Sequence, residues 1–140
     1  MKIKVPVSDI MSKEIVKLNL SDSLSKAEQL FKNHKIRHIP VVSANKIVGM
    51  LSYTDLLKAS FADFSDDDEC VETTVFNMFS IEQVMTKDVI SIPHYTTIKE
   101  AAEILNSHDF RALPVVQEEQ IVGMITTTDL INYLISQFSE

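Results

Sequence analysis

The chain has 140 residues, of which 45% are hydrophobic and 24% charged, a composition typical of a globular protein rather than a disordered one. Its net charge of −7, with scattered basic residues, disfavours direct binding of DNA or RNA, because such proteins usually carry a basic face. No apolar run approaches the roughly 18–20 residues that cross a bilayer, and the start MKIKVPVSDIM lacks the apolar core of a signal peptide. A single cysteine, Cys70, excludes an internal disulfide. We therefore expect a cytoplasmic protein without a membrane partner.

An internal repeat organises the chain. A shift of 74 positions aligns residues 10–59 with residues 84–133 without a gap, and the identical pairs include Pro-Val-Val and Thr-Asp-Leu blocks. The chain's only two glycines, Gly49 and Gly123, open the matching segments GMLSYTDL and GMITTTDL. Such self-similarity indicates duplicated units that pack on each other, here as a pseudo-twofold pair. We expect repeats at residues 1–60 and 80–140, joined by a linker at 61–79.

The expected elements follow the same order in both copies. Short β-rich runs at 14–18 and 88–92 come first, and helices at about 23–34 and 97–108 follow. The second helix is marked by an apolar stripe from Ile98 to Leu105 and by a capping box at Thr97 and Glu100. Strands at 38–42 and 46–53, and at 113–116 and 120–126, form hairpins with tight loops. A last helix begins near Ser52 and Thr126. Each copy is therefore β-α-β-β-α, and the fold class is mixed α/β.

The linker has no counterpart in the other parts of the chain. Its centre, residues 65–69, is acidic and turn-prone, which is typical of a solvated loop. A cation site there is the alternative, although the run lacks the spaced ligands of an EF-hand loop. Cys70 lies beside these acids, which raise rather than lower a thiol pKa, so a catalytic thiol is not expected.

The repeated corners Ser52-x-x-Asp55 and Thr126-x-x-Asp129 have two readings. Each fits a helix N-terminal cap with an acid at the third helical position, and a cap needs no ligand. A helix N-terminus is also a natural anion site, because free N–H groups and the helix dipole favour negative charge. Extra hydroxyls, Thr54 and Thr128, stand where a cap requires none. Capping and binding are compatible with each other.

Basic residues precede the second strand of each copy. Arg37 and Arg111 are surface residues, partners in an intramolecular ion pair, or phosphate ligands, and a planar guanidinium suits bidentate phosphate contact. His38 adds a pH-dependent contact in the first copy only. The repeated His34 and His108 fall at expected helix ends, which favours a structural role over metal binding, because no acid or cysteine partner lies at ligand spacing.

The order DIMSKEIVKL, RHIPVV and KIVGMLSYTDLL, repeated as QVMTKDVISI, RALPVV and QIVGMITTTDLI, resembles a tandem pair of cystathionine-β-synthase (CBS) domains, a Bateman module. The resemblance covers nearly the whole chain except the linker. It implies two repeats packed through their sheets, two clefts that bind adenosine-containing ligands, a homodimer, and regulation of an effector protein.

Carried onto this sequence, the resemblance implies a role for each matching position. The aspartates accept hydrogen bonds from ribose hydroxyls, the neighbouring hydroxyl residues lie beside ribose or phosphate, the basic residues contact phosphates, and the first strands line the adenine pocket. Ala112 replaces His38, so the two clefts should differ in positive charge. The nucleotide-binding residues predicted in this way are Ile15, Val16, Arg37, His38, Pro40, Ser52, Thr54, Asp55, Val89, Ile90, Arg111, Ala112, Pro114, Thr126, Thr128 and Asp129.

No sequence motif of catalysis is present: there is no nucleophile elbow, Walker loop, zinc spacing or catalytic cofactor motif. We therefore predict that the chain is not an enzyme, and the resemblance to CBS domains implies a regulatory sensor of AMP, ADP or ATP that relays occupancy to an unknown effector protein. The alternative is a dimerisation scaffold with degenerate clefts that bind no ligand. This interpretation is favoured by Ala112, which stands where the first copy has His38.

Overall fold

The computed structural model describes residues 4–62, 79–109 and 111–138 and divides the chain into two compact units. The first unit is Val16–Val89, and the second unit combines Met1–Ile15 with Ile90–Glu140. The chain therefore changes unit between residues 15 and 16 and again between 89 and 90, two points that are 74 positions apart. Most of the predicted linker, with its acidic run and Cys70, lies outside the described residues.

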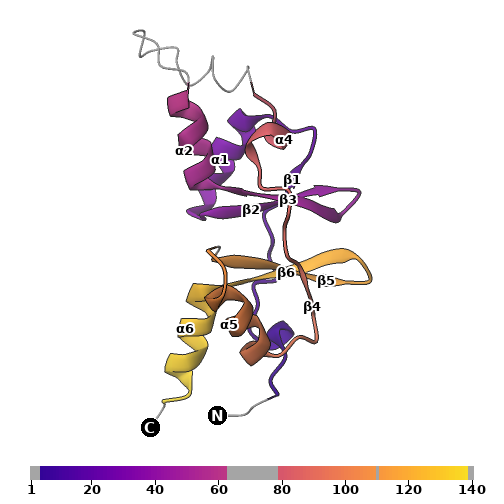
Figure 1. The fold of residues 1–140 in the computed structure, drawn as a ribbon, viewed down its shortest axis with the longest axis vertical. Helices are drawn as coiled ribbons and strands as arrows, with labels where there is room; N and C mark the ends of the chain where they lie inside the picture. The colour runs from indigo at the N-terminus through magenta and orange to yellow at the C-terminus, as the bar shows by residue number, and fades with distance from the viewer. Residues whose placement is uncertain (1–3, 63–78, 110, 139–140) are drawn as a thin grey trace. The chain divides into compact units, whose positions relative to one another are not determined.

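The first unit contains the predicted β-α-β-β-α repeat (Figure 1). Its elements are β1 (Leu18–Asn19), α1 (Leu24–His34), β2 (His38–Ser43), β3 (Lys46–Ser52) and α2 (Tyr53–Ala62), followed by the short α4 (Ile81–Val84). The sheet order is β1-β2-β3, with β1 parallel and β3 antiparallel to β2. Helices α1 and α2 lie on the same side of this sheet (Figure 1).

The second unit repeats this plan. Its elements are the 3₁₀ helix η1 (Val7–Asp9), β4 (Ile92–Pro93), α5 (Ile98–Asn106), β5 (Ala112–Gln117), β6 (Gln120–Thr126) and α6 (Thr127–Ser136). The sheet order is β4-β5-β6, with the same parallel and antiparallel pairings. A register shift falls between Val41 and Val42 in one sheet and between Val115 and Val116 in the other, so even the irregularity is duplicated. The predicted mixed α/β class and the β-α-β-β-α order are confirmed.

The first strand of each repeat is shorter and later than the sequence predicts. Only Leu18 and Asn19 pair with β2, and only Ile92 and Pro93 pair with β5. The β-rich residues just before them belong to the stretch in which the chain passes from one unit to the other, so they have no neighbouring strand in register. Helix α5 likewise ends at Asn106, two residues before the predicted end.

Both predicted hairpin loops are tight two-residue turns. Ala44 and Asn45 have φ of 53° and 63°, and Glu118 and Glu119 have φ of 52° and 66°. Positive φ at both central residues is the mark of a type I′ turn, whose twist matches that of the flanking strands. The turns fix the pairing of Ser43 with Lys46 and of Gln117 with Gln120.

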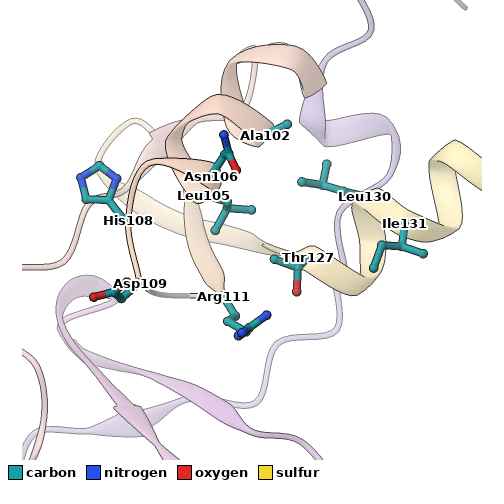
Figure 2. A pocket seen from close by; sticks show the side chains of 9 residues that line it. All are labelled: Ala102, Leu105, Asn106, His108, Asp109, Arg111, Thr127, Leu130 and Ile131. Carbon is teal, nitrogen blue, oxygen red and sulfur yellow. The ribbon is translucent and has the colours of Figure 1, made fainter.

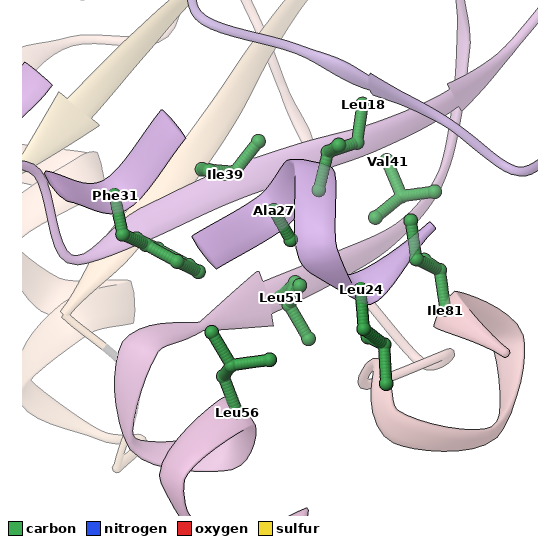
Figure 3. Packing of buried hydrophobic residues seen from close by; sticks show 9 residues of the cluster. All are labelled: Leu18, Leu24, Ala27, Phe31, Ile39, Val41, Leu51, Leu56 and Ile81. Carbon is green, nitrogen blue, oxygen red and sulfur yellow. The ribbon is translucent and has the colours of Figure 1, made fainter. Parts of the chain in front are cut away.

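Each unit has its own apolar core between its sheet and its helices. The first core is shown in Figure 3 and consists of Leu18, Leu24, Ala27, Phe31, Ile39, Val41, Leu51, Leu56 and Ile81. The second consists of Val7, Ile92, Ala101, Leu105, Leu113, Val115 and Ile125. The corner at the end of β3 or β6 is held by this packing, because the residue before Ser52 or Thr126, Leu51 or Ile125, is fully buried.

Candidate functional site

Strand pairing brings an arginine beside the helix corner in each unit. His38, the first residue of β2, pairs with Ser52, the last residue of β3, and Tyr53 N–H donates to the Arg37 carbonyl at 2.9 Å. In the second unit Ala112 pairs with Thr126, and Thr127 N–H donates to the Arg111 carbonyl at 3.0 Å. These are the only two arginines of the chain. The arginines and the Ser/Thr-x-x-Asp corners were each noted in the sequence, and these hydrogen bonds place them side by side in both units.

The corners are helix caps, as one of the two readings predicts. Thr126 Oγ1 accepts from Asp129 N–H at 3.1 Å, and Asp129 Oδ2 accepts from Thr126 N–H at 2.9 Å, which completes a capping box at α6. Ser52 Oγ accepts from Asp55 N–H at 3.0 Å at the start of α2. A carboxylate offers about four acceptor positions on two oxygens, so the cap leaves acceptor capacity on Asp129 for a ligand hydroxyl.

The remaining polar candidates lie at the ends of the same elements. Thr54 and Thr128 are exposed in the first turns of α2 and α6, and the caps do not use them. Arg37 and Arg111 are exposed, whereas His38 is half-buried. Its counterpart Ala112 is only 5% exposed, so the two corners differ in both polarity and accessibility. Pro40 and Pro114 are buried two pairs further along the sheets, opposite Met50 and Met124.

The predicted adenine-lining residues occupy the two unit crossings. Val16 belongs to the first unit and packs partly buried against its core, and the equivalent Ile90 does the same in the second unit. Their neighbours Ile15 and Val89 are half-buried and belong to the second and the first unit, respectively. Each unit therefore holds one residue of each predicted pair, and none of the four lies in a strand.

Each unit contains a contact between a methionine and a glycine that was not predicted from the sequence. A Cβ placed on Gly49 would fall on Met85 Sδ, and one on Gly123 would fall on Met11 Sδ. Neither glycine has a positive φ, so glycine is required here for close approach and not for a special backbone conformation. The signal was available, because Met11 and Met85 are also 74 positions apart.

Backbone bridges beside these contacts fix the same segments. Ser12 and Met124 exchange two hydrogen bonds, of 2.9 and 3.0 Å, and Thr86 and Met50 exchange two of 2.9 and 3.0 Å. Each segment therefore adds one paired residue to the outer strand of a sheet, β6 or β3. The stretches that lead into the unit crossings are therefore anchored twice, by the methionine and by the bridged residue that follows it.

The two repeated histidines lie at helix ends, as the structural reading predicts. His34 is the last residue of α1. His108 follows α5, and its Nδ1 lies 2.8 Å from the Ile104 carbonyl and 3.1 Å from Ser107 Oγ. In the described parts of the chain, no group of three His, Cys, Asp or Glu side chains is arranged to hold a metal ion.

Two β-α-β-β-α units with matching corners define a duplicated α/β module. The family model of the CBS domain matches the chain twice, at residues 7–62 and 81–136, and the chain belongs to this family. The chain is 30% identical to the Vibrio cholerae protein AcuB, named for acetoin utilization. The two structures superpose with a TM-score of 0.79 over 96% of this chain and 93% of that one.

Two further similarities bear on function. The CBS-domain pair of protein MJ0100, solved with 5′-methylthioadenosine and S-adenosyl-L-methionine, is 25% identical, with a TM-score of 0.79 over 97% of this chain and 99% of that one. A homoserine O-acetyltransferase from Methanohalobium evestigatum is 34% identical over 134 residues, which are 94% of this chain but 24% of the enzyme. The chain thus spans about a quarter of the acetyltransferase, and the match assigns no acetyl transfer to it.

Proposed function

We propose that the chain is a regulatory module that binds an adenosine-containing ligand, AMP, ADP or ATP, in clefts between its two repeats and relays occupancy to an effector protein. The observation that carries this proposal is the duplicated corner, where an arginine lies beside a capped Ser/Thr-Asp pair. The ligands named for the MJ0100 domain pair, both of which contain adenosine, support the same class of ligand. The proposed role is binding without catalysis and without a catalytic cofactor.

Each part of such a ligand has a matching group on the chain. A guanidinium at Arg37 or Arg111 can contact a phosphate in bidentate fashion, and the nearby helix N-terminus adds a positive dipole. The carboxylates of Asp55 and Asp129 can accept from ribose hydroxyls, because a carboxylate is an acceptor only. Adenine would contact the apolar residues at the unit crossings, which join the two units covalently.

The two binding positions should differ in affinity for phosphate. His38 stands beside Arg37, whereas the buried Ala112 stands beside Arg111. A histidine supplies an additional donor, and a positive charge when it is protonated. We therefore propose that the position containing Arg37 and His38 prefers the more highly phosphorylated ligand.

Isothermal titration calorimetry of the whole chain with AMP, ADP, ATP and S-adenosylmethionine tests this function. We expect saturable binding of at least one nucleotide, and a higher melting temperature when it is present. Arg111→Gln and Asp129→Asn should each weaken one binding event, since Asn keeps an acceptor oxygen for the cap but loses the charge. Lys99→Gln is the matched control, because it removes a positive charge from an exposed position on α5. Failure of all four ligands to bind would contradict the proposal.

A homodimeric scaffold is the second candidate, and α6 favours it. Ile131, Leu134, Ile135 and Phe138 are 56%, 45%, 63% and 74% exposed. Residues 130–138 carry no charged side chain in a chain with a net charge of −7, so two copies of this face would meet without repulsion. Sedimentation velocity should show a dimer that Ile135→Lys weakens. A dimer indifferent to every nucleotide would favour the scaffold over the sensor.

The expected cytoplasmic location stays a prediction. Among the described helices, none combines the length and the hydropathy that a membrane-spanning segment needs.

A further inference from the structure

We propose that a pocket between α5 and α6 of the second unit binds a small planar anion, an aromatic carboxylic acid, at a position that overlaps the proposed nucleotide site only at Arg111. The pocket has a volume of about 400 Å³ and is shown in Figure 2. It is lined by Ala102, Leu105, Asn106, His108, Asp109, Arg111, Thr127, Leu130 and Ile131. All of these belong to one compact unit, and Arg111 alone is shared with the predicted nucleotide-binding residues.

The first unit shows what fills this space when it is closed. There, Phe31 of α1 and Tyr53 of α2 pack edge to face, with ring centroids 5.5 Å apart and an interplanar angle of 61°. The 74-residue shift places Leu105 and Thr127 at these positions. Both replacements are smaller than an aromatic ring, so α5 and α6 carry no ring at the two positions whose rings pack together between α1 and α2.

The burial of one repeated leucine supports this comparison. Leu56 of α2 is 1% exposed and belongs to the first core, in the same cluster as Phe31. Its counterpart Leu130 of α6 is only half-buried and lines the pocket. The repeated leucine is therefore a core residue in the first unit and lines the pocket in the second unit, where positions 105 and 127 carry no ring.

The lining has two chemical parts. The side chains of Ala102, Leu105, Leu130 and Ile131 provide an apolar surface. Figure 2 shows the Arg111 side chain on the same side of the pocket as Thr127, while the Asp109 carboxylate points away from that side. A guanidinium and a hydroxyl at the start of α6 favour an anionic group there, and the apolar surface favours a flat hydrocarbon body.

The size of the pocket agrees with a ligand of one or two rings. Small-molecule sites usually measure about 300–1,000 Å³ and combine an apolar lining with a few polar groups that orient the ligand. At about 400 Å³ the pocket lies near the lower end of that range. An aromatic acid would restore the ring that the first unit supplies internally and would pair its carboxylate with Arg111.

Titration of the whole chain with 2-naphthoate, followed by ¹H–¹⁵N NMR, tests the proposal. We expect saturable shifts of the amide signals of Ala102, Leu130 and Thr127. The double variant Leu105→Phe with Thr127→Tyr copies the first unit's aromatic pair, and it should weaken binding at least about tenfold. Arg111→Gln should weaken 2-naphthoate but not the neutral 2-naphthalenemethanol. Lys99→Gln serves again as the charge-matched control.

A second variant keeps the test decisive if the double variant does not fold. Ala102→Leu adds a good helix former to α5 that projects into the same pocket, and it should also weaken binding. Unchanged affinity in a folded variant of either kind would overturn the proposal, and so would the absence of binding to the wild-type chain at millimolar 2-naphthoate. Shifts confined to residues 134–138, or binding that disappears on dilution of a dimer in sedimentation velocity, would instead assign this face to a contact between copies and overturn it.

The proposal for this pocket and the proposal of nucleotide binding can be contradicted separately. Loss of 2-naphthoate binding with retained nucleotide binding in the double variant supports two distinct sites, because that variant leaves Thr126, Thr128 and Asp129 unchanged.

Discussion

The two units of this chain have the same backbone plan and fill it differently. In the first unit Phe31 and Tyr53 pack together between α1 and α2, and Leu56 is buried in the same core. In the second unit Leu105 and Thr127 leave a pocket beside Leu130. What the two units keep in common is the region around the corner: the cap, the arginine and the methionine on the glycine. The two copies are therefore alike at the corner and different at the interface between their helices.

Truncation of the repeated leucine should give the largest difference in stability loss between the two units. Leu56→Ala should lower the free energy of unfolding by about 2–5 kcal/mol, because it leaves a cavity in a packed core. Leu130→Ala should cost clearly less, since that side chain already borders a pocket. Urea denaturation gives the total loss, and amide exchange assigns it to a unit. Leu56→Met is the volume-conserving control, and equal losses at the two leucines would contradict the comparison.

Substitution of the glycines should affect both units alike. Gly49→Ala and Gly123→Ala should each destabilise by about 1–3 kcal/mol, because the added methyl group overlaps a methionine sulfur. Combining Gly49→Ala with Met85→Ala should cost less than the sum of the single changes, as expected for two groups in contact. Additive losses, measured by urea denaturation, would show that the two residues do not interact.

Removal of the cap hydroxyls should have a smaller effect. Ser52→Ala and Thr126→Ala should each lower the free energy of unfolding by about 0.5–2 kcal/mol, because each leaves a helix N–H without its acceptor. Thermal unfolding measures the loss, and replacement by Asp, which keeps an acceptor, is the control. If Thr126→Ala reduces nucleotide binding while the melting temperature is unchanged, the hydroxyl acts on the ligand and not as a cap.

The smallest effect concerns the first helix of each repeat and depends on pH. Hydrogen bonds from Thr97 N–H and Oγ1 lower the pKa of Glu100 below its ordinary value of 4.5. A carboxyl with a lowered pKa stabilises the fold above its unfolded pKa, and this contribution is lost as pH falls below 4.5 through the folded pKa. The equivalent position in α1 is Lys26, so only α5 should show this dependence.

Amide exchange at the start of α5 between pH 5 and pH 3 can check this last expectation. Glu100→Gln keeps the capping-box geometry without a titrating group, and it should remove the pH-dependent part of the protection. Persistence of the same dependence in that variant would contradict the assignment to Glu100.

The parts of the fold that were predictable from the sequence depend on neighbours close in the chain. The cap at Thr97, the hairpin turn at Ala44 and Asn45 and the box at Thr126 each involve residues at most four positions apart. The corner could be predicted as a cap for the same reason. Which residues bind a ligand was inferred from resemblance, and those assignments remain predictions.

The missed features depend on partners far apart in the chain. Met11 contacts Gly123, and the residues before each first strand lie where the chain passes from one unit to the other. Local pattern shows β-rich residues at 14–18 but not the absence of a neighbouring strand. The pocket was missed because it arises from two individually ordinary residues, Leu105 and Thr127, whose significance appears only when they are compared with the aromatic pair.

The path of the chain between the units has a consequence for the order of folding. The first unit is one continuous stretch, Val16–Val89, so all of its partners have been synthesised once residue 89 has left the ribosome. The second unit needs residues before position 16 as well as residues after position 89, and Met11 must wait for Gly123. Loop closure over such a separation is slow relative to local pairing. During synthesis the first unit should therefore fold first, while the early residues that belong to the second unit remain without their sheet.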